Sequence, residues 1–244
     1  LSCLRLCVSA GESVNPDVVR PWKALSGAPL LDGYGQTETL MTILNYPCLP
    51  VKPGSMGKPI PGTRFVVVGQ AGEILGDDQE GQLAMQLPHP QYMLGYWNDA
   101  QRTADATRTI DGVDYWLTGD LGYRDADGYL FYTGRADDII SSAGYRIGPT
   151  EVENALQEHP AVVESAVVSS PDPERGEVVK AYVVLHEGHA PSEALIADIQ
   201  RHVKESTAPY KYPRKIEFVE SLPKNPSGKL LRRALRDREF GVVR

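Results

Sequence analysis

The segment Asp32-Gly-Tyr-Gly-Gln-Thr-Glu38 holds residue types that suit a ligand carrying phosphates. Its two glycines allow a backbone to approach a ligand closely, because glycine has no Cβ atom. Thr37 offers a hydroxyl to a phosphate oxygen, and Glu38 offers a hard carboxylate oxygen to Mg²⁺, an ion that bridges phosphates. The ring of Tyr34 can lie against a flat base such as adenine. On local pattern alone, a tight turn with an incidental acid is the alternative.

A second group of residues suits a sugar and its phosphate. Asp120 follows a predicted strand and a glycine, and its carboxylate can accept hydrogen bonds from both hydroxyls of a ribose. Arg135 can reach the same sugar and Arg146 the phosphate side, because the planar guanidinium fork stays charged. Taken singly, Asp120 is more typical of a β-turn, and each arginine is equally typical of a solvated surface.

Lys229 closes the segment Pro223-Lys-Asn-Pro-Ser-Gly-Lys229. The prolines and Gly228 predict that this loop is extended and mobile and lies outside any packed element. An isolated ammonium group on such a loop is normally solvated, so the local pattern does not assign it a function.

Four motifs in this order resemble the acyl-adenylate-forming (AMP-binding) superfamily, which holds acyl-CoA synthetases, adenylation domains of peptide synthetases and luciferases. They are Tyr34-Gly-Gln-Thr-Glu38, Thr118-Gly-Asp120, Gly134-Arg-Ala-Asp-Asp138 with Gly144-Tyr-Arg-Ile147 and Pro149-Thr-Glu-Val-Glu153, and Pro223-Lys-Asn-Pro-Ser-Gly-Lys229. Four ordered motifs are more specific than any one, and the similarity covers essentially the whole chain. Within the superfamily, Ala143-Gly-Tyr-Arg-Ile-Gly148 and Val162-Val-Glu-Ser-Ala-Val-Val-Ser-Ser-Pro-Asp-Pro173 most resemble the medium-chain acyl-CoA synthetases.

This resemblance implies a two-step ligase. A carboxylic acid, either a medium-chain fatty acid or an aryl acid, reacts with ATP to give acyl-AMP, and coenzyme A then displaces AMP to give acyl-CoA. The implied cofactors are ATP/AMP, Mg²⁺ and coenzyme A. The Gly/Ser/Thr-rich phosphate loop of the family and most of its acyl pocket are missing from these 244 residues. The sequence is therefore interpreted as the C-terminal part of such an enzyme, and we expect it not to adenylate an acid alone.

The resemblance also assigns roles to residues. The implied catalytic residues are Thr37, Glu38, which also binds the metal, and Lys229, which swings toward the acid and the α-phosphate. There a point cation stabilises the negative charge of the transition state. Asp137 is the implied hinge, and a lysine acetyltransferase and deacetylase are expected partners acting on Lys229. The implied nucleotide-binding residues are Gly11, Glu12, Ser13, Asp32, Gly33, Tyr34, Gly35, Gln36, Thr37, Asp120, Arg135 and Arg146. The implied CoA-binding residues are Ala143, Gly144, Tyr145, Arg175, Lys204, Tyr212, Pro213 and Arg214.

Three rival functions stay open. The adenylation domain of a peptide synthetase would be followed by a carrier domain, whereas only 15 residues follow Lys229. A luciferase-like oxygenase would use the same adenylation and emit light with a luciferin. A non-catalytic module that only binds a nucleotide is disfavoured, because Glu38, Asp120, Arg135 and Lys229 are all present.

Composition narrows the class of protein further. The formal net charge is −7, from 25 basic and 32 acidic residues, which disfavours nucleic-acid and anionic-membrane partners. The three cysteines have no metal-ligand spacing and the five histidines show none either. We expect a reducing compartment, the cytoplasm or, in a eukaryote, the mitochondrial matrix. No apolar run long enough for a membrane span and no signal peptide is recognised.

The elements that position these residues are predicted to form two domains of mixed α/β and α+β class. Residues 1–136 are expected to be the C-terminal part of a large domain. A strand (4–9), a helix (16–25) and a strand from residue 30 predict a parallel α/β layer to about residue 47.

An irregular crossing rich in proline and glycine follows, over 47–62. Short strands at 64–68, 81–86, 114–117 and 129–132, with a short helix at 98–103, predict a β-barrel-like region from about residue 48. Asp125-Ala-Asp-Gly128 is interpreted as a hairpin turn rather than a calcium loop.

Residues 137–244 are predicted to form a small, mobile α+β domain beyond the hinge. A hairpin over 139–147 leads into a helix, where Thr150 and Glu153 have the spacing of a capping box. Strands are predicted at 162–169, 177–186 and 215–219, a second helix over 192–205, and a basic helix over 229–239.

Overall fold

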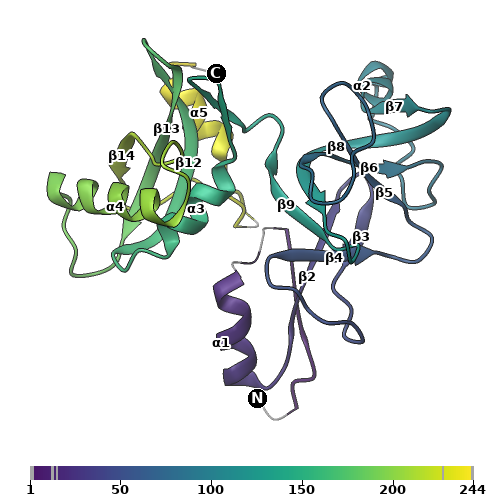
Figure 1. Cartoon of the computed structure of the whole chain (residues 1–244), viewed down its shortest axis with the longest axis horizontal. Coiled ribbons are helices and arrows are strands. Elements are labelled where there is room, and N and C mark those ends of the chain that lie inside the picture. The colour runs from purple at the N-terminus through teal and green to yellow at the C-terminus, as the bar shows by residue number, and fades with distance from the viewer. Residues whose placement is uncertain (1–2, 12–13, 15, 227, 243–244) are drawn as a thin grey trace. The chain divides into compact units, whose positions relative to one another are not determined.

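The computed structural model describes residues 3–11, 14, 16–226 and 228–242. The chain divides into two compact units, Leu1–Ala136 and Asp137–Arg244. Figure 1 labels their helices and strands. Each unit has its own sheet and its own buried core, so each is described by itself.

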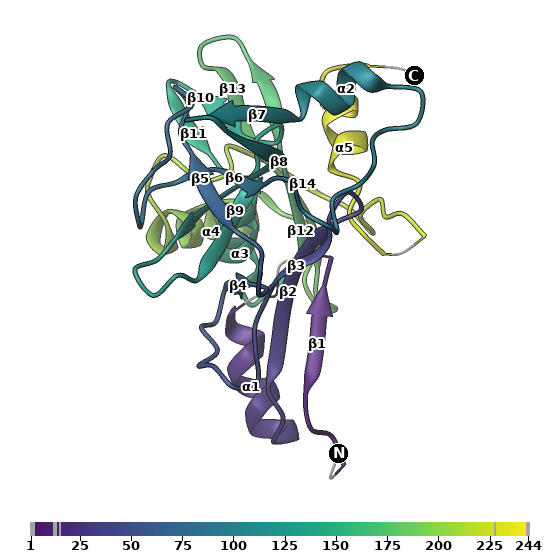
Figure 2. The ribbon, with the colours of Figure 1, turned by 90° about the vertical axis from the view of Figure 1, so that its right-hand side faces the viewer.

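The first unit begins with a β-α-β layer. Strand β1 (Cys7–Ala10) pairs in parallel with β2 (Leu30–Gln36), and helix α1 (Pro16–Ser26) connects the two strands. The helix lies beside this strand pair in both views of the ribbon (Figures 1 and 2). Because the strands are parallel, the end of β1 at Ala10 lies beside Gly33 of β2. The predicted parallel α/β layer is confirmed.

Antiparallel strands extend this layer. Strand β3 (Leu40–Leu44) pairs with β2, and β4 (Ser55–Pro59) joins β3 to β9 (Leu130–Arg135). The prediction of an irregular crossing over residues 47–62 is therefore wrong, because β4 lies within it. Gly57 explains how a strand fits there: it has φ +98°, and an added Cβ would lie 2.0 Å from the Leu44 carbonyl oxygen.

The remaining strands of the first unit are β5 (Phe65–Val68), β6 (Gly81–Gln86), β7 (Thr107–Ile110) and β8 (Val113–Arg124), with helix α2 (Ala100–Asp105) before β7. The sheet order is β1-β2-β3-β4-β9-β8-β6-β5, and β7 pairs with β8. This path is open at both ends, so the described residues form no closed barrel, and the barrel-like expectation gives way to a continuous mixed sheet. Residues 125–128 form the predicted hairpin turn between β8 and β9, where Lys52 pairs with Asp125 and Asp127.

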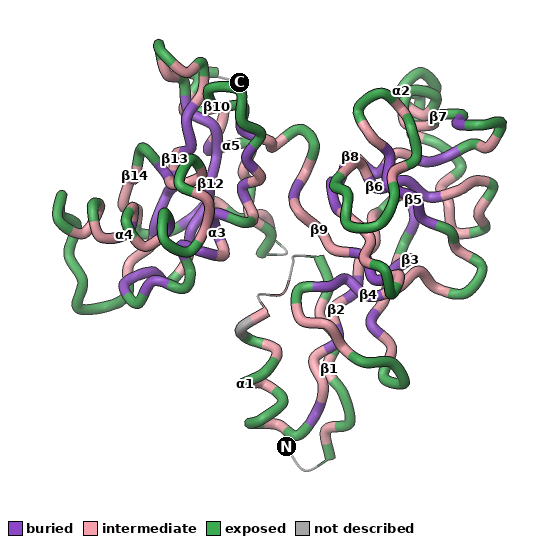
Figure 3. Tube along the Cα trace, viewed as in Figure 1, coloured by how far each residue is buried: buried purple, intermediate pink, exposed green. Residues whose placement is uncertain are grey.

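Buried residues of the first unit, purple in Figure 3, lie largely in its central strands. Ile43, Leu83, Met85, Trp116 and Leu130 are each at most 3% exposed. They lie on β3, β6, β8 and β9, so apolar burial fixes the register of the strands that carry Thr118-Gly-Asp120 and Arg135.

The second unit is a five-stranded sheet between helices. Its order is β11 (Tyr145–Ile147), β10 (Ile140–Ser142), β13 (Gly176–Leu185) and β12 (Val162–Asp172), and β14 (Lys215–Phe218) pairs in parallel with β13. The helices are α3 (Pro149–Gln157), α4 (Glu193–Ser206) and α5 (Arg232–Glu239). The prediction that this unit combines helices with a sheet, as an α+β fold does, is confirmed.

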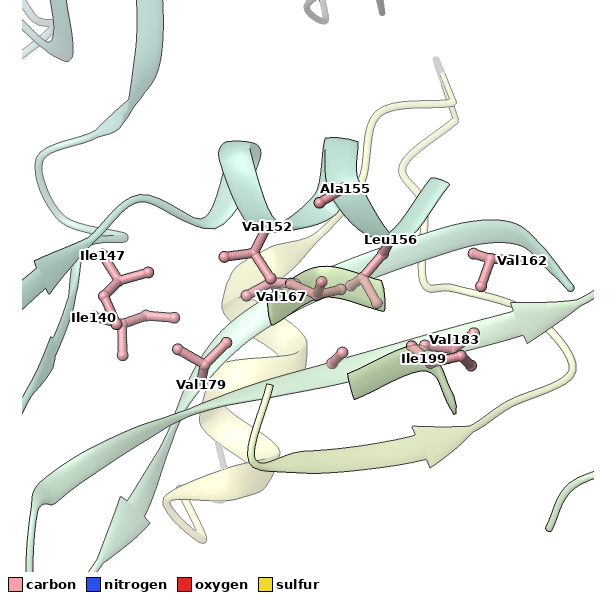
Figure 4. Close-up of a cluster of buried hydrophobic side chains, with 12 residues drawn as sticks. Ile140, Ile147, Val152, Ala155, Leu156, Val162, Val167, Val179, Val183 and Ile199 are labelled. Carbon is pink, nitrogen blue, oxygen red and sulfur yellow. The ribbon is translucent and has the colours of Figure 1, made fainter. Parts of the chain in front are cut away.

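Alternation along β12 places helices on both faces of this sheet. Val167 packs with Val152 and Leu156 of α3 and with Ile199 of α4 (Figure 4). The neighbouring Ala166 and Val168 belong to a second cluster on the opposite face, with Leu235 of α5. Helix α5 is thus part of the fold of this unit, which matters for the loop that precedes it.

The predicted capping box at Thr150 and Glu153 is wrong. The N-cap of α3 is Gly148, it makes no side-chain capping bond, and Thr150 lies inside the helix. Glu153 is 6% exposed, and its carboxylate accepts a hydrogen bond from the Val167 backbone N–H and pairs with Arg232 of α5. Sequence spacing matched a capping box, but a stronger tertiary partner takes the carboxylate.

Glu153→Ala is expected to destabilise the second unit by about 3–5 kcal/mol, because it removes a buried carboxylate that pairs with Arg232 and accepts the Val167 backbone N–H. Thr150→Ala is the matched control and should cost under about 0.5 kcal/mol, since no cap is lost. Urea unfolding of the 244-residue chain checks both. A larger loss for Thr150→Ala than for Glu153→Ala would restore the capping box.

Candidate active site

The buried carboxylate of Asp120 is the centre of a polar cluster in the first unit. Asp120 lies within β8, directly after Gly119 with φ +75°, and is 5% exposed. Its Oδ2 accepts hydrogen bonds from the Tyr34 hydroxyl at 2.6 Å and from the Gln36 side-chain amide at 2.7 Å. Asp120 is therefore a strand residue at a local irregularity, and the β-turn alternative is excluded.

Arg135 lies opposite Asp120 across the β8–β9 pair. Its Nη1 atom is 3.5 Å from Asp120 Oδ1. This is the outer limit of a hydrogen bond, and it leaves the two groups close enough to bind the same sugar. The structure thus brings together the two residues that sequence reasoning assigned to a ribose.

Gln36 positions this carboxylate. Its amide nitrogen also donates to the Thr118 carbonyl oxygen at 2.8 Å, and its amide oxygen accepts from the indole N–H of Trp116 at 3.3 Å. Thr118 adds its hydroxyl, which accepts from the Asp120 backbone N–H. Sequence reasoning named Gln36 as a nucleotide ligand, whereas the geometry gives it contacts that orient Asp120. Trp116 was not singled out, because it reads as an ordinary core residue.

Tyr34 stays a hydrogen-bond donor over a wide pH range. Burial of its hydroxyl and the nearby negative charge of Asp120 hold the pKa of Tyr34 well above its ordinary value. A neutral phenol donates to Asp120, so Tyr34 and Gln36 together stabilise the ionised carboxylate. The contact of the Tyr34 ring with adenine stays a prediction.

Thr37 and Glu38 lie in the turn between β2 and β3. Thr37 is exposed, and Glu38 is half-buried and accepts a hydrogen bond from the Tyr96 hydroxyl at 2.8 Å. The guanidinium of Arg102 lies 3.8 Å from the centre of the Tyr96 ring. Burial and the hydrogen bond to Glu38 raise the pKa of Tyr96. Tyr96 is a residue that sequence reasoning missed, since it is far from the motif in the chain.

The donor set around Glu38 fits a magnesium ion held largely by its substrate. In the described part of the chain, no group of three or more His, Cys, Asp or Glu residues could hold a metal by itself. Mg²⁺ typically uses one or two protein carboxylates and completes its shell with phosphates and water. Glu38 supplies one such oxygen in a half-buried turn, so the assignment of Glu38 to Mg²⁺ stays a prediction.

The glycines of the motif have a packing role. A Cβ at Gly35 would lie 1.9 Å from the Leu40 carbonyl oxygen, and one at Gly33 would meet the side chains of Leu44 and Met41 at 2.7 Å. On the Cβ side of both glycines the space is filled by β3, and the approach of a nucleotide to their backbone stays a prediction. Both glycines allow the close β2–β3 pairing that forms the turn at Thr37 and Glu38.

The remaining predicted nucleotide ligands of this region are Asp32 and the segment that follows β1. Gly11 follows β1 and has φ +97°, whereas Glu12 and Ser13 lie outside the described residues. Asp32 lies beside Ser9 of β1 and accepts a hydrogen bond from the Gly33 backbone N–H at 2.9 Å. Burial raises the pKa of Asp32 to about 6, against the lowering effect of backbone hydrogen bonds from Gly33 and Val14.

Lys229 lies on a cross-bonded loop in the second unit. The Lys229 N–H donates to the Asn225 side chain at 2.8 Å, and the Lys229 carbonyl oxygen accepts from the Asn225 N–H at 2.9 Å. Lys224 and Leu230 form a β-bridge next to this pair. The prediction of an extended loop is wrong, because Asn225 supplies bonds that the proline and glycine pattern did not reveal. The side chain of Lys229 is exposed.

The predicted CoA-binding residues form two neighbouring groups in the second unit. Ala143 and Gly144 form the β10–β11 turn, both with positive φ, and the Ala143 N–H donates to the Arg175 carbonyl oxygen at 3.3 Å. Lys204 Nζ and the guanidinium of Arg214 lie 4.0 and 4.9 Å from the Tyr212 ring centre.

An aromatic stack connects these two groups. The ring of Tyr145 lies on that of Tyr210, with ring centres 4.1 Å apart. Pro213 accepts a hydrogen bond from the Gln200 side chain at 2.9 Å, which fixes the loop after α4. Sequence reasoning missed Tyr210. Arg146 is exposed on β11, and its phosphate contact stays a prediction, as does the CoA assignment of both groups.

Comparison with known proteins decides the family. The model of the AMP-binding enzyme matches residues 1–97, and the model of the AMP-binding enzyme C-terminal domain matches residues 151–229. Together the two models cover well over half of the chain. The chain belongs to the AMP-binding enzyme family. The resemblance to this family, which the four sequence motifs indicated, is confirmed.

Curated relatives of this AMP-binding chain are acyl-coenzyme A synthetases. It is 50% identical to mitochondrial ACSM3 from Homo sapiens over 245 residues, which covers 98% of the chain and 41% of that relative. It is 51% identical to mitochondrial ACSM4 from Rattus norvegicus over 242 residues, with 98% and 41% covered. The chain thus spans about two fifths of the length of the curated relatives it matches.

Solved structures share the fold. A structure of the anthranilate CoA ligase AuaEII in complex with anthranoyl-AMP matches with a TM-score of 0.86 and 38% identity, over 98% of this chain and 45% of that one. A benzoate CoA ligase from Burkholderia xenovorans LB400 matches with a TM-score of 0.83 and 36% identity, over 96% and 45%. No helix in the described ranges is long and apolar enough to cross a membrane.

The raised pKa of Asp32 gives a pH-dependent prediction. The pKa of Asp32 is about 6 when folded and about 3.8 when unfolded, so the folded state loses stability as pH rises between these values. Asp32→Asn should therefore be more stable than the wild type above pH about 7 and should match it below pH about 4. Urea unfolding at several pH values checks this. Glu80→Gln, on an exposed side chain, is the control. A stability difference that does not change with pH would contradict the assignment.

Proposed function

We propose that this chain supplies the C-terminal part of an AMP-forming acyl-CoA synthetase. The observation that carries the proposal is the Asp120 cluster: a buried carboxylate held by Tyr34 and Gln36 and faced by Arg135. This arrangement suits a ribose, because a carboxylate accepts from hydroxyls and a guanidinium donates to sugar and phosphate oxygens. Membership of the AMP-binding family supports the assignment of this ribose to ATP and AMP.

The proposed reaction activates a medium-chain fatty or aryl acid as acyl-AMP and then transfers the acyl group to coenzyme A. The curated relatives are named as acyl-coenzyme A synthetases, and two matched structures are CoA ligases for anthranilate and benzoate. These names support the thioester product and, among the acids, the aryl acids. We place the enzyme in the cytoplasm or, in a eukaryote, in the mitochondrial matrix. The word mitochondrial in the names of the curated relatives supports a mitochondrial location.

In this proposal the first unit binds the nucleotide. Asp120 accepts the ribose hydroxyls, Tyr34 lies against the adenine, and Thr37 donates its hydroxyl to the phosphate. Mg²⁺, when bound at Glu38, neutralises phosphate charge. Gln36 and Tyr34 keep the Asp120 carboxylate ionised and oriented, so the sugar meets a preformed acceptor.

The second unit, a small mobile domain, supplies Lys229 for the first step and the CoA-binding group for the second. An ammonium beside the α-phosphate reduces the repulsion between the attacking carboxylate and the phosphate. Asp137, the first residue of the second unit, is the proposed hinge between the two steps. Acetylation of Lys229 would remove the same charge, and an acetyltransferase acting there stays part of the proposal.

Asp120→Ala is expected to weaken AMP binding by about 30- to 1000-fold, since it removes charge-assisted hydrogen bonds worth roughly 2–4 kcal/mol. The measurement is calorimetry on a protein of the relatives' length that contains these 244 residues, called the full-length enzyme below. Asp77→Ala is the control, because Asp77 is a half-exposed carboxylate that pairs with Arg124. Thermal melting must show that Asp120→Ala is folded, and Asp120→Asn replaces it otherwise. Unchanged AMP affinity in a folded variant rejects the ribose assignment.

Lys229→Ala tests the reaction itself. In the full-length enzyme it should form acyl-AMP about 10²–10³ times more slowly, because it loses one contact to the charge of the transition state. Unfolding should shift by less than about 0.5 kcal/mol, since the side chain is exposed. Supplied with synthetic acyl-AMP and coenzyme A, the variant should make thioester at close to the wild-type rate.

Pyrophosphate release and thioester formation are measured separately in this test. Lys224→Ala is the control on the same loop, where the ammonium pairs with Glu164. Equal slowing of both half-reactions would contradict the role of Lys229 in adenylation. Amide formation without thioester formation would favour an amide bond synthetase, the activity named for one matched structure from Marinactinospora thermotolerans.

A further inference from the structure

Helix α5 carries two arginines one turn apart, and both reach out to other parts of the second unit. Residues spaced by four lie on one side of a helix, so Arg232 and Arg236 project from the same side. Arg232 pairs with Glu153, and the two side chains are only 17% and 8% exposed. Glu153 also accepts from the Val167 backbone N–H. This buried pair fixes the start of α5 to α3 and β12.

Arg236 contacts the start of the segment 137–139, which lies between the first unit and β10 and is called the linker below. Its Nη1 atom donates to the Asp137 carbonyl oxygen at 2.7 Å and lies 3.1 Å from Asp138 Oδ1. The Asp138 side chain is 14% exposed, so this ion pair is partly shielded from water. A guanidinium suits both acceptors at once, because its donors are arranged in a rigid planar fork. The contact spans about a hundred residues of sequence, and no local motif predicts it.

The same helix directly follows the loop of Lys229. Only Leu230 and Leu231 separate Lys229 from Arg232, and the Leu231 N–H donates to the Pro223 carbonyl oxygen at 2.9 Å. Together with the Asn225–Lys229 bonds, this closes the loop at its base. The position of the loop therefore follows the position of α5.

We propose that Arg236 is a positioning residue that ties the linker to the helix that carries the Lys229 loop. The second unit then moves as one body from the Asp137 carbonyl group onward, including Asp138, α5 and the Lys229 loop. The pivot is therefore confined to the backbone bonds of Asp137 that precede this carbonyl group. This inference rests on the proposed function, in which the small domain rotates between two half-reactions. It assigns a mechanical role in the reaction to a residue that touches neither substrate nor cofactor.

Hydrogen exchange of the 244-residue chain tests the tether without any catalytic assay. Arg236→Ala should raise the exchange rate of amides in residues 137–141 by about ten-fold or more, because two charge-assisted contacts to the linker are lost. Arg236→Lys should give a smaller increase. Arg233→Ala is the matched control: Arg233 lies on the same helix, is 63% exposed and faces Asp237 at 3.9 Å. Unchanged exchange in Arg236→Ala would overturn the proposal.

Asp138→Asn provides a variant that leaves the helix intact. It should also raise linker exchange, and combining it with Arg236→Ala should add less than the sum of the two effects, because both remove the same ion pair. Full additivity would show that the pair does not hold the linker. If Arg236→Ala fails to fold, Asp138→Asn alone carries the test, and unchanged linker exchange in this variant overturns the proposal.

The full-length enzyme separates a positioning role from a structural one. With Arg236→Ala, thioester formation from supplied acyl-AMP should slow by about three-fold or more relative to acyl-AMP formation, and Arg236→Lys should restore most of the ratio. Equal slowing of both half-reactions with a lowered melting temperature would mean a structural role only and would overturn the proposal. If the wild-type full-length enzyme makes no acyl-AMP while Arg236→Ala still speeds linker exchange, the tether is supported and the proposed function is rejected.

Discussion

A buried negative charge needs hydrogen-bond donors, and this requirement organises the first unit. The Asp120 carboxylate is 5% exposed, a position that is costly for an ion without partners. Tyr34 and Gln36 donate to this carboxylate from β2, the Arg135 guanidinium faces it from β9, and the Thr118 hydroxyl accepts a hydrogen bond from the Asp120 backbone N–H. The sheet order places β2 and β9 apart, and the side chains that cross between them meet at one carboxylate. The pairing of β8 with β9 and the β2–β3 hairpin therefore serve the same small cluster.

In the second unit, a shielded carboxylate is stabilised by an ion pair with an arginine. Glu153 and Arg232 are both shielded from water, and they fasten α5 to the opposite side of the sheet from α3. Because α5 follows the Lys229 loop immediately, this buried interaction fixes where the exposed loop ends. Stability and positioning are thus carried by the same side chains.

Sequence patterns predicted the parts of this fold that depend on local periodicity. Helix α1, the hairpin predicted at residues 139–147 and helix α4 follow from apolar spacing and turn residues, and the structure has them within about two residues. The first strand, predicted at residues 4–9, begins later, at Cys7. The failures have tertiary causes. Glu153 has the spacing of a capping residue but pairs with Arg232, and β4 forms within a segment rich in proline and glycine because Gly57 allows β3 to approach.

The same division applies to the candidate site. Asp120 and Arg135 were paired from their residue types, and the register of β8 and β9 brings them together. Trp116, Tyr96 and Arg236 were not foreseen, because their roles are contacts with residues far away in the chain. Spacing shows which side chains could meet a ligand, whereas only three-dimensional packing shows which side chains hold those residues in place.

The close β2–β3 pairing at Gly35 has a consequence for how substitutions in this motif are interpreted. Any side chain at this position would displace the Leu40 backbone and, with it, the turn that carries Thr37 and Glu38. In a screen of all substitutions, Gly35 would therefore score as intolerant as a ligand-binding residue, although its effect is transmitted through backbone spacing. Tolerance at Thr37, which is exposed and not constrained by this packing, is the better measure of what the ligand itself demands. The heptapeptide Asp32–Glu38 is therefore constrained both by its ligand and by the packing of the β2–β3 hairpin. Comparing substitutions at Gly35 with substitutions at Thr37 separates these two constraints.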